Sequence, residues 1–186
     1  MEKALFDKLY TDVFTEQQEK ELTDTINLVE AIKPKIVVEI GMKVGGTLNF
    51  WRHLTPKPEL VIGIDSDNLI TWDTSSDPSV RTIIGNSLFY GTYEKLRSVL
   101  DGRDIDFLFI DGGHVYGETK SDFYTYGWHV RKGGLIAIHD TYLDSCGDIV
   151  GAVKHFWEET KRRSGRDWKI VYDEHINTGT GVVEII

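Results

Sequence analysis

The chain of 186 residues has little cysteine, little basic charge and no long apolar run. Its single cysteine, Cys146, cannot form an intramolecular disulfide, which excludes a secreted scaffold held by disulfides and favours a reducing compartment. No stretch approaches the roughly 20 apolar residues that span a bilayer. The opening MEKALFDKLYTD also lacks the apolar core of a signal peptide. We therefore expect a soluble cytoplasmic protein with no membrane partner.

Basic side chains are outnumbered as well, with 21 Lys and Arg against 30 Asp and Glu and a formal net charge of −9. This excess of negative charge repels the phosphate backbone of nucleic acids and the surface of anionic lipids. We therefore expect no nucleic-acid partner. The length corresponds to one domain at about 150 residues each, and 40% hydrophobic residues is typical of a globular fold.

The sequence does contain a change of hydrophobic pattern at Lys35. Before it, apolar residues at helical spacing predict two amphipathic helices, with Leu5, Phe6, Leu9 and Val13 on the first and Leu22, Ile26, Val29 and Ile32 on the second. Thr15 and Gln18 match a capping box for the second helix. We expect residues 1–34 to form a helical cap.

After Lys35, short apolar runs alternate with helical stretches. The runs are KIVVEI, LVIGID, VRTIIG, DIDFLFID and GGLIAIHD. Consecutive apolar residues are typical of parallel strands covered on both faces, so this βαβ alternation predicts an open α/β sheet. A helix from about Asp148 to Arg163 and a hairpin of DWKIVYDEH and TGVVEII, separated by INTG, are predicted to end the fold. No linker divides the chain, so we expect one domain over 1–186 with its core in 35–186.

The ends of the predicted strands are polar, and ligands of open α/β sheets bind beyond these ends. The first strand leads into the glycine-rich turn Gly41-Met42-Lys43-Val44-Gly45-Gly46-Thr47, and the second ends in Asp65. A carboxylate roughly 20 residues after such a turn is placed to accept hydrogen bonds from both ribose hydroxyls. The two features together indicate a nucleoside ligand.

The turn departs from the dinucleotide fingerprint G-x-G-x-x-G, because it reads E-x-G-x-x-x-G-G. Glu39 would put negative charge beside the turn, which opposes a pyrophosphate and suits an amino group or a sulfonium. This favours S-adenosylmethionine over a nicotinamide cofactor. A turn built only for packing and a nicotinamide-dependent oxidoreductase are the alternatives.

Over residues 35–186 the chain resembles the class I S-adenosylmethionine-dependent methyltransferases. VVEIGMKVGGT is similar to their first motif, GIDSDN to their ribose-binding motif, and GNS to the turn that flanks adenine. The resemblance implies a Rossmann-like methyltransferase fold with a seven-stranded, mostly parallel sheet of order 3-2-1-4-5-7-6 and an antiparallel terminal hairpin. The cofactor-binding residues that it implies are Glu39, Gly41, Met42, Lys43, Gly45, Thr47, Asp65, Ser66, Asn86, Ser87 and Asp111.

A narrower resemblance lies in FLFIDGGHVYGETKSDFYTYGWHVRKGGLIAIHDTY, which is similar to macrocin-type sugar O-methyltransferases and cephalosporin-hydroxylase-like proteins. It implies a divalent metal, usually Mg²⁺, held by Asp111, His139 and Asp140, with His114 as the general base. His139 stands where those relatives carry a carboxylate. Because imidazole is a softer ligand than a carboxylate, Mn²⁺, iron and Zn²⁺ are also candidates for this site. A site that binds no metal is the alternative.

The residues themselves support the same chemistry. Asp111 and the pair His139-Asp140 end predicted neighbouring strands at one edge of the sheet, and the neutral imidazole of His114 can accept a hydroxyl proton. An oxygen nucleophile must lose a proton before methyl transfer, whereas a nitrogen with a free lone pair need not. We therefore predict metal-assisted O-methylation of a small-molecule hydroxyl.

Three alternatives stay open at this point. His114 and His139 could be structural residues of their loops. The fold could serve a non-catalytic module that binds a cofactor or a partner, because fold does not imply function. The N-terminal helices could also pair two copies into a homo-oligomer.

Overall fold

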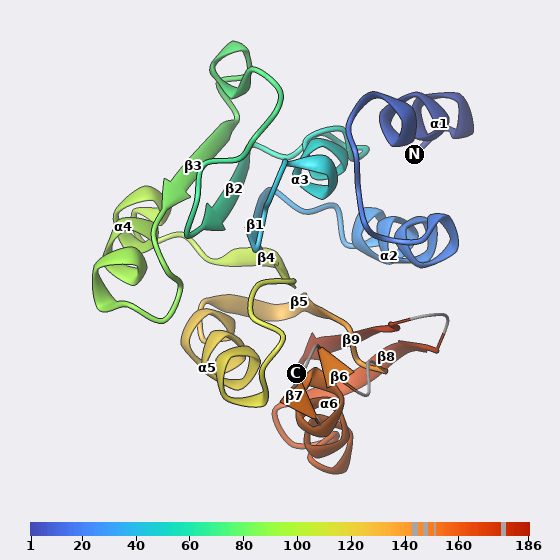
Figure 1. Ribbon diagram of the computed structural model, residues 1–186, viewed down its shortest axis with the longest axis vertical. Helices are drawn as coiled ribbons and strands as arrows, with labels where there is room; N and C mark the ends of the chain where they lie inside the picture. Colours follow the sequence, from blue (N-terminus) through green and yellow to red (C-terminus); the bar gives the residue numbers. More distant parts are fainter. Residues whose placement is uncertain (143–144, 147–148, 151, 176–177) are drawn as a thin grey trace.

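One seven-stranded sheet organises the computed structural model (Figure 1), which describes residues 1–142, 145–146, 149–150, 152–175 and 178–186. The sheet has the order β3-β2-β1-β4-β5-β9-β8, with β9 antiparallel to both of its neighbours and the other strands parallel. This confirms the predicted order and terminal hairpin. The strands are β1 (Ile36–Ile40), β2 (Leu60–Asp65), β3 (Val80–Ile84), β4 (Ile105–Ile110), β5 (Val130–His139), β8 (Trp168–Glu174) and β9 (Thr180–Ile185).

Helices cover both faces of this sheet (Figure 1). One face carries α1 (Lys3–Asp12), α2 (Glu19–Ala31) and α3 (Gly46–Trp51), and the other carries α4 (Tyr90–Leu100), α5 (Tyr116–Gly127) and α6 (Ala152–Arg162). The two layers explain why β1 and β4 are buried along their whole length. No helix of the described ranges is long and apolar enough to cross a membrane.

The two N-terminal helices are part of the core. Phe6 of α1 and Ile26 of α2 join Phe50 and Trp51 of α3 in one buried cluster beneath β1 and β4. Burying an aromatic or aliphatic side chain of this size stabilises a fold by about 1.5–3 kcal/mol. This burial holds the segment between α1 and α2 against the sheet edge where the parallel strands end.

One helix begins later than the sequence-based expectation. The helix predicted from Asp148 begins at Ala152, because Ser145–Cys146 (β6) and Ile149–Val150 (β7) pair as a short antiparallel ladder. Asp148 itself, and the first two residues of INTG, lie outside the described residues. The polar stretch after β2 contains a short 3₁₀ helix, η1 (Thr74–Ser76).

The predicted capping box is wrong. Gln18 is itself the N-cap residue of α2, with extended backbone and no side-chain cap. The Thr15 hydroxyl instead donates a hydrogen bond to the side chain of Gln17, the residue before the cap. A long-range contact of Gln17, described below, accounts for this departure.

One carboxylate in the α5 layer is almost completely buried. Asp122 is 1% exposed, and neither of its oxygens has a hydrogen-bond partner among the residues described. Burial raises the pKa of Asp122 from 3.8 to about 7. The folded protein therefore binds a proton here that the unfolded chain releases near pH 4.

Because of this residue, we expect the stability to fall as the pH rises from about 4 to about 7. The unfolded chain binds fewer protons than the folded protein across that range. Asp122→Asn removes the ionisation. We therefore expect the free energy of unfolding of this variant to exceed that of the wild type by about 1–3 kcal/mol at pH 8 and to equal it near pH 4. Urea denaturation of both proteins across this range measures the difference. A difference that does not change with pH would contradict the assignment.

Candidate functional site

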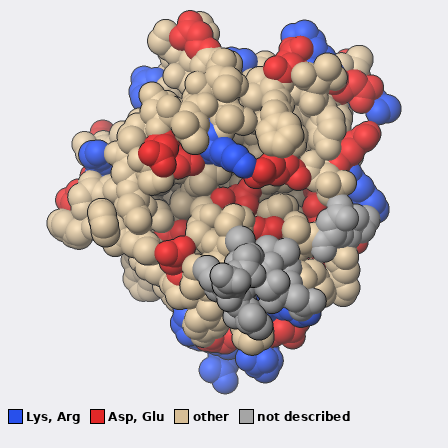
Figure 2. Space-filling view, in the orientation of Figure 1, with Lys and Arg blue, Asp and Glu red and all other residues tan. Residues whose placement is uncertain are grey.

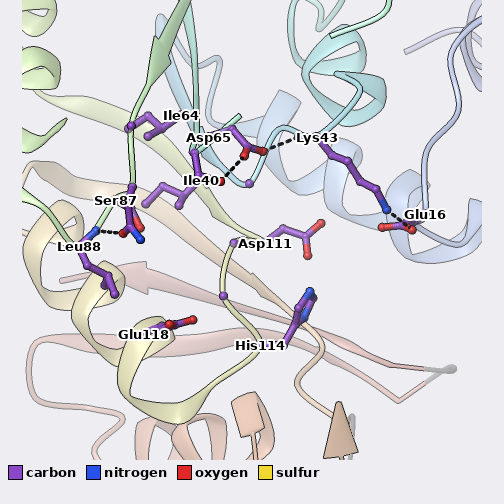
Figure 3. Close-up of a pocket in the computed structure, with 16 residues that line it drawn as sticks. Glu16, Ile40, Lys43, Ile64, Asp65, Ser87, Leu88, Asp111, His114 and Glu118 are labelled. Carbon is purple, nitrogen blue, oxygen red and sulfur yellow. Dashed lines mark hydrogen bonds and ion pairs between the residues drawn. The ribbon is translucent and has the colours of Figure 1, made fainter. Parts of the chain in front are cut away.

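A cleft of about 440 Å³ opens beyond the carboxyl ends of β1, β2 and β4, at the place where open α/β sheets bind ligands (Figure 3). Its volume lies within the usual range for small-molecule sites. Eight of the sequence-predicted residues line it, namely Gly41, Lys43, Asp65, Ser66, Asn86, Ser87, Asp111 and His114.

The close approach of two strand ends forms the floor of the cleft. Gly41 has a φ of +87°, and a Cβ atom there would lie 2.0 Å from the backbone oxygen of Asp111. The Asp111 amide also donates to the Ile40 carbonyl oxygen at 2.8 Å. Only glycine fits at position 41, because any side chain would collide with the backbone after β4.

Asp65 lies at the end of β2 with its carboxylate on the cleft wall (Figure 3). Its Oδ2 accepts the backbone N–H of Lys43 at 2.8 Å, and its Oδ1 accepts that of Asp67 at 3.2 Å. These bonds hold the carboxylate against the glycine-rich turn, and the Ser66 hydroxyl donates a longer bond to Oδ1 at 3.4 Å. Oδ2 keeps a further lone pair for a ligand hydroxyl.

The turn after β3 forms the adjoining wall, since the Gly85 N–H donates to the Asp65 carbonyl oxygen at 2.7 Å. Asn86 Oδ1 accepts the Leu88 N–H at 2.8 Å, and the Tyr126 hydroxyl of α5 donates to the Ser87 carbonyl oxygen at 2.6 Å. The Asn86 oxygen is therefore engaged within the turn, which leaves its NH₂ group as the free donor of that amide.

The cleft is acidic. Figure 2 shows acidic side chains in and around the hollow of this face. The acidic residues on the lining are Glu16, Asp65, Asp111 and Glu118, against one lysine, Lys43, and one histidine, His114. Lys43 itself pairs with Glu16 at 2.6 Å. Such a lining favours a cationic ligand and disfavours a phosphate.

Three potential metal ligands meet beside the cleft, and their ligand atoms all lie within 4.8 Å of one another. His139 Nδ1 is 3.1 Å from Asp111 Oδ1 and 3.2 Å from Asp140 Oδ1. Neighbouring ligands about 2.1 Å from one ion lie about 3 Å apart, so this spacing fits a single divalent cation. The other oxygen of Asp140 pairs with His114 Nδ1.

Burial and charge oppose each other in this group. Burial alone would lower the pKa of His139, which is 7% exposed, but the carboxylates of Asp111 and Asp140 outweigh it and place that pKa well above the ordinary value. Burial likewise raises the pKa of Asp140, and hydrogen bonds from His114 and His139 reverse the effect and lower it. The hydrogen bond to Asp140 is the main cause of a raised pKa at His114. The group therefore concentrates negative charge around the imidazole of His139.

Asp140 also has an unusual backbone. Its φ of +61° lies in the left-handed region, which few residues other than glycine adopt. Strain of this kind is found at functional sites, where the surrounding structure enforces it. The conformation is consistent with a functional demand on this carboxylate.

Four predicted cofactor residues do not line the main cleft. Glu39 is buried within β1, and its burial, with Asp111 nearby, raises its pKa well above the ordinary value. Met42 and Thr47 line a small adjoining recess, and Gly45 packs beneath the Trp72 ring, whose Nε1 donates to its carbonyl oxygen. The sequence assigns the negative charge beside the turn to Glu39, but the acidic residues that line the cleft supply it instead.

Sequence reasoning missed the segment between α1 and α2. Glu16 lines the cleft, and Gln17 Nε2 donates to Asp111 Oδ2 at 2.6 Å across 94 positions of the chain. Neither residue belongs to a motif or to a periodic pattern. Only their positions in the folded chain reveal them.

A family profile described as a methyltransferase domain matches residues 38–141, from within β1 to just beyond Asp140. The chain belongs to this methyltransferase family. The match spans the glycine-rich turn, the cleft lining apart from Glu16, and the three potential metal ligands. It confirms the resemblance to class I methyltransferases. No curated protein sequence matches the chain.

Solved structures agree on the fold. The MycE methyltransferase of the mycinamycin biosynthetic pathway, solved with Mg, SAH and mycinamycin VI, is 20% identical with a TM-score of 0.71. The alignment covers 98% of this chain and 53% of MycE, so the chain spans about half of that relative's length. A putative caffeoyl-CoA O-methyltransferase from Staphylococcus aureus is 16% identical with a TM-score of 0.75, covering 98% of this chain and 91% of that one. A putative O-methyltransferase from Klebsiella pneumoniae is 15% identical, with a TM-score of 0.71 and coverages of 100% and 91%.

Gly41→Ala tests the floor of the cleft. We expect it to lower the free energy of unfolding by more than about 1–2 kcal/mol, because the left-handed backbone penalty adds to the collision with Asp111. Gly117→Ala in α5 is the matched control, since a Cβ there meets nothing within 4 Å and alanine favours a helix by about 0.5–1 kcal/mol. Urea denaturation compares the two. Equal stability of both variants would contradict the close approach.

Proposed function

We propose that this chain transfers the methyl group of S-adenosylmethionine to a hydroxyl of a small molecule, with a divalent metal ion at Asp111, His139 and Asp140. The observation that carries the proposal is the place of these three residues. They adjoin an acidic cleft at the sheet edge where the family binds its cofactor, and His114 contacts one of them. MycE, which shares the fold, was crystallised with Mg and SAH.

The cofactor is assigned to the main cleft by charge and by hydrogen-bonding capacity. Asp65 accepts the ribose hydroxyls, and the turn at Asn86 and Ser87 lies along the adenine. Ser66, Gly41 and Lys43 line the path between them. The acidic lining suits the positive sulfonium and amino groups of S-adenosylmethionine.

The donor set suits a divalent cation, because two carboxylates supply charge and one imidazole supplies a nitrogen ligand. A bound ion would lower the pKa of an acceptor hydroxyl and orient it. His114, whose side chain is partly exposed and lines the cleft, would take the hydroxyl proton through Nε2 while Asp140 holds Nδ1. The remaining task is alignment, since methyl transfer from sulfur requires the nucleophile in line with the bond that breaks.

Binding of the cofactor is the first test. We expect S-adenosylhomocysteine, the product, to bind in calorimetric titrations. Asp65→Asn should weaken this binding about 10- to 100-fold, because a hydrogen bond to a charged group contributes about 1.5–3 kcal/mol. Asp67→Asn is the control, since Asp67 is exposed on the same loop and does not line the cleft. Absence of binding, or equal loss in both variants, would overturn the cofactor assignment.

The role of His114 is tested by turnover. With Mg²⁺ or Mn²⁺ present, labelled S-adenosylmethionine should methylate a member of a panel of sugars and phenols, and a chelator should abolish the transfer. His114→Ala should lower kcat about 10²- to 10⁴-fold, the usual contribution of a general base, with S-adenosylhomocysteine affinity preserved.

Full activity of the His114→Ala variant would show that His114 is not the general base. Cofactor binding without turnover on any acceptor, and without metal binding, would favour the non-catalytic module.

A further inference from the structure

Two side chains at the N-terminal end of α2 contact the group of three potential metal ligands. Gln17 and Glu21 are four residues apart, on either side of the Gln18 N-cap, and their side chains contact Asp111 and His139. Gln17 precedes the N-cap and Glu21 lies in the first turn of the helix, so both side chains are at the same end of α2. Both come from outside the segment that the family profile matches, 38–141.

Gln17 is 4% exposed and its amide is held at both ends. Its Nε2 donates to Asp111 Oδ2 at 2.6 Å, and its Oε1 accepts the Thr47 hydroxyl at 2.7 Å. The two contacts fix which end of the amide faces Asp111. One carboxylate oxygen of Asp111 is thereby occupied, and the other, Oδ1, faces His139.

Glu21 is a buried carboxylate with no obvious structural purpose. It is 1% exposed, and within the described part of the chain neither of its oxygens has a hydrogen-bond partner. Its Oε2 lies 4.0 Å from His139 Nε2, the ring nitrogen that faces away from Asp111 and Asp140. A buried carboxyl group that makes no hydrogen bond is costly, and the imidazole of His139 is the ion-pair partner that the structure records for it.

We propose that Gln17 and Glu21 form the outer shell of a divalent-cation site, in which Glu21 orients His139 and Gln17 orients Asp111. This inference rests on the metal site of the proposed function. Histidine ligands generally donate their second ring N–H to a carboxylate, which fixes the ring and its tautomer. Glu21 and the Thr178 hydroxyl, 3.4 Å from the same nitrogen, are the groups available to receive that proton.

The arrangement has a specific consequence for each ligand. His139 presents Nδ1 to the cation and keeps its proton on Nε2, and Asp111 binds through Oδ1 alone because Gln17 holds Oδ2. Both are positioning effects, since neither Gln17 nor Glu21 contacts the cation. An imidazole backed by a carboxylate is a more basic ligand than an unsupported one, which suits it to the place that a carboxylate holds in the relatives.

The test measures metal binding to the full chain, without an acceptor. The EPR signal of free Mn²⁺ gives the Kd for the wild type, Gln17→Met and Glu21→Met, and Glu21→Gln restores an acceptor oxygen without the charge. We expect both Met variants to bind Mn²⁺ about 10- to 100-fold more weakly, the usual effect of losing an outer-shell partner, with Glu21→Gln in between. Glu19→Met is the matched control, because it removes an exposed carboxylate from the same helical turn.

Two further readouts separate positioning from general damage. The thermal midpoint of metal-free Glu21→Met should equal or exceed that of the wild type, since an apolar side chain of similar length replaces a buried carboxyl group that makes no hydrogen bond. In Zn²⁺-loaded wild type, ¹H–¹⁵N spectra should show the His139 proton on Nε2.

Wild-type Mn²⁺ affinity in Glu21→Met and Gln17→Met, or a proton on Nδ1 of His139, would overturn the outer-shell assignment. So would an absence of Mn²⁺ binding in the wild type. S-adenosylhomocysteine binding, measured in the same samples, reports separately on the proposed function. Loss of that binding with the metal effects intact would remove the methyltransferase proposal and leave the outer shell standing.

Discussion

The close approach of two backbones at Gly41 and Asp111 is the constraint on which the site depends. Parallel strands β1 and β4 are adjacent in the sheet, so their carboxyl ends arrive together. Because residue 41 has no side chain, the turn after β1 lies directly against the turn after β4. This brings the glycine-rich turn and the candidate metal ligand Asp111 into one continuous surface. A larger residue at position 41 would separate them.

Electrostatics is the second organising feature. The protein carries excess negative charge, and part of that excess is concentrated where it is most costly, in the cleft and in the cluster behind it. Asp111, Asp140 and Glu21 surround His139, and the first two raise its pKa strongly. A group of carboxylates around one imidazole is stable only with a cation among them, whether a proton or a metal ion. A metal ion would meet that demand and serve the chemistry.

The N-terminal helices connect packing to this chemistry. Apolar residues of α1 and α2 are buried against α3 and the sheet, and that burial carries Gln17 and Glu21 to the back of the ligand cluster. The Gln17 amide also accepts a hydrogen bond from Thr47 of the glycine-rich turn, so this one side chain links the turn to Asp111. The helical cap therefore contributes polar contacts to the site in addition to apolar side chains in the core. The contact of Gln17 with Asp111 explains why the residues between α1 and α2 do not form a capping box.

Local sequence determined the elements, their order and the strand-end residues of the site. Consecutive apolar runs specified doubly covered strands, and the positions of Gly41, Asp65, Asp111 and Asp140 at strand ends followed from them, because parallel strands all end at one edge. Tertiary structure alone decided the rest. Glu39 is buried in β1 away from the cleft, whereas Gln17 contacts Asp111 across 94 positions. Short-range patterns record how a residue relates to its own helix or strand, and contacts between distant segments depend on how whole elements pack.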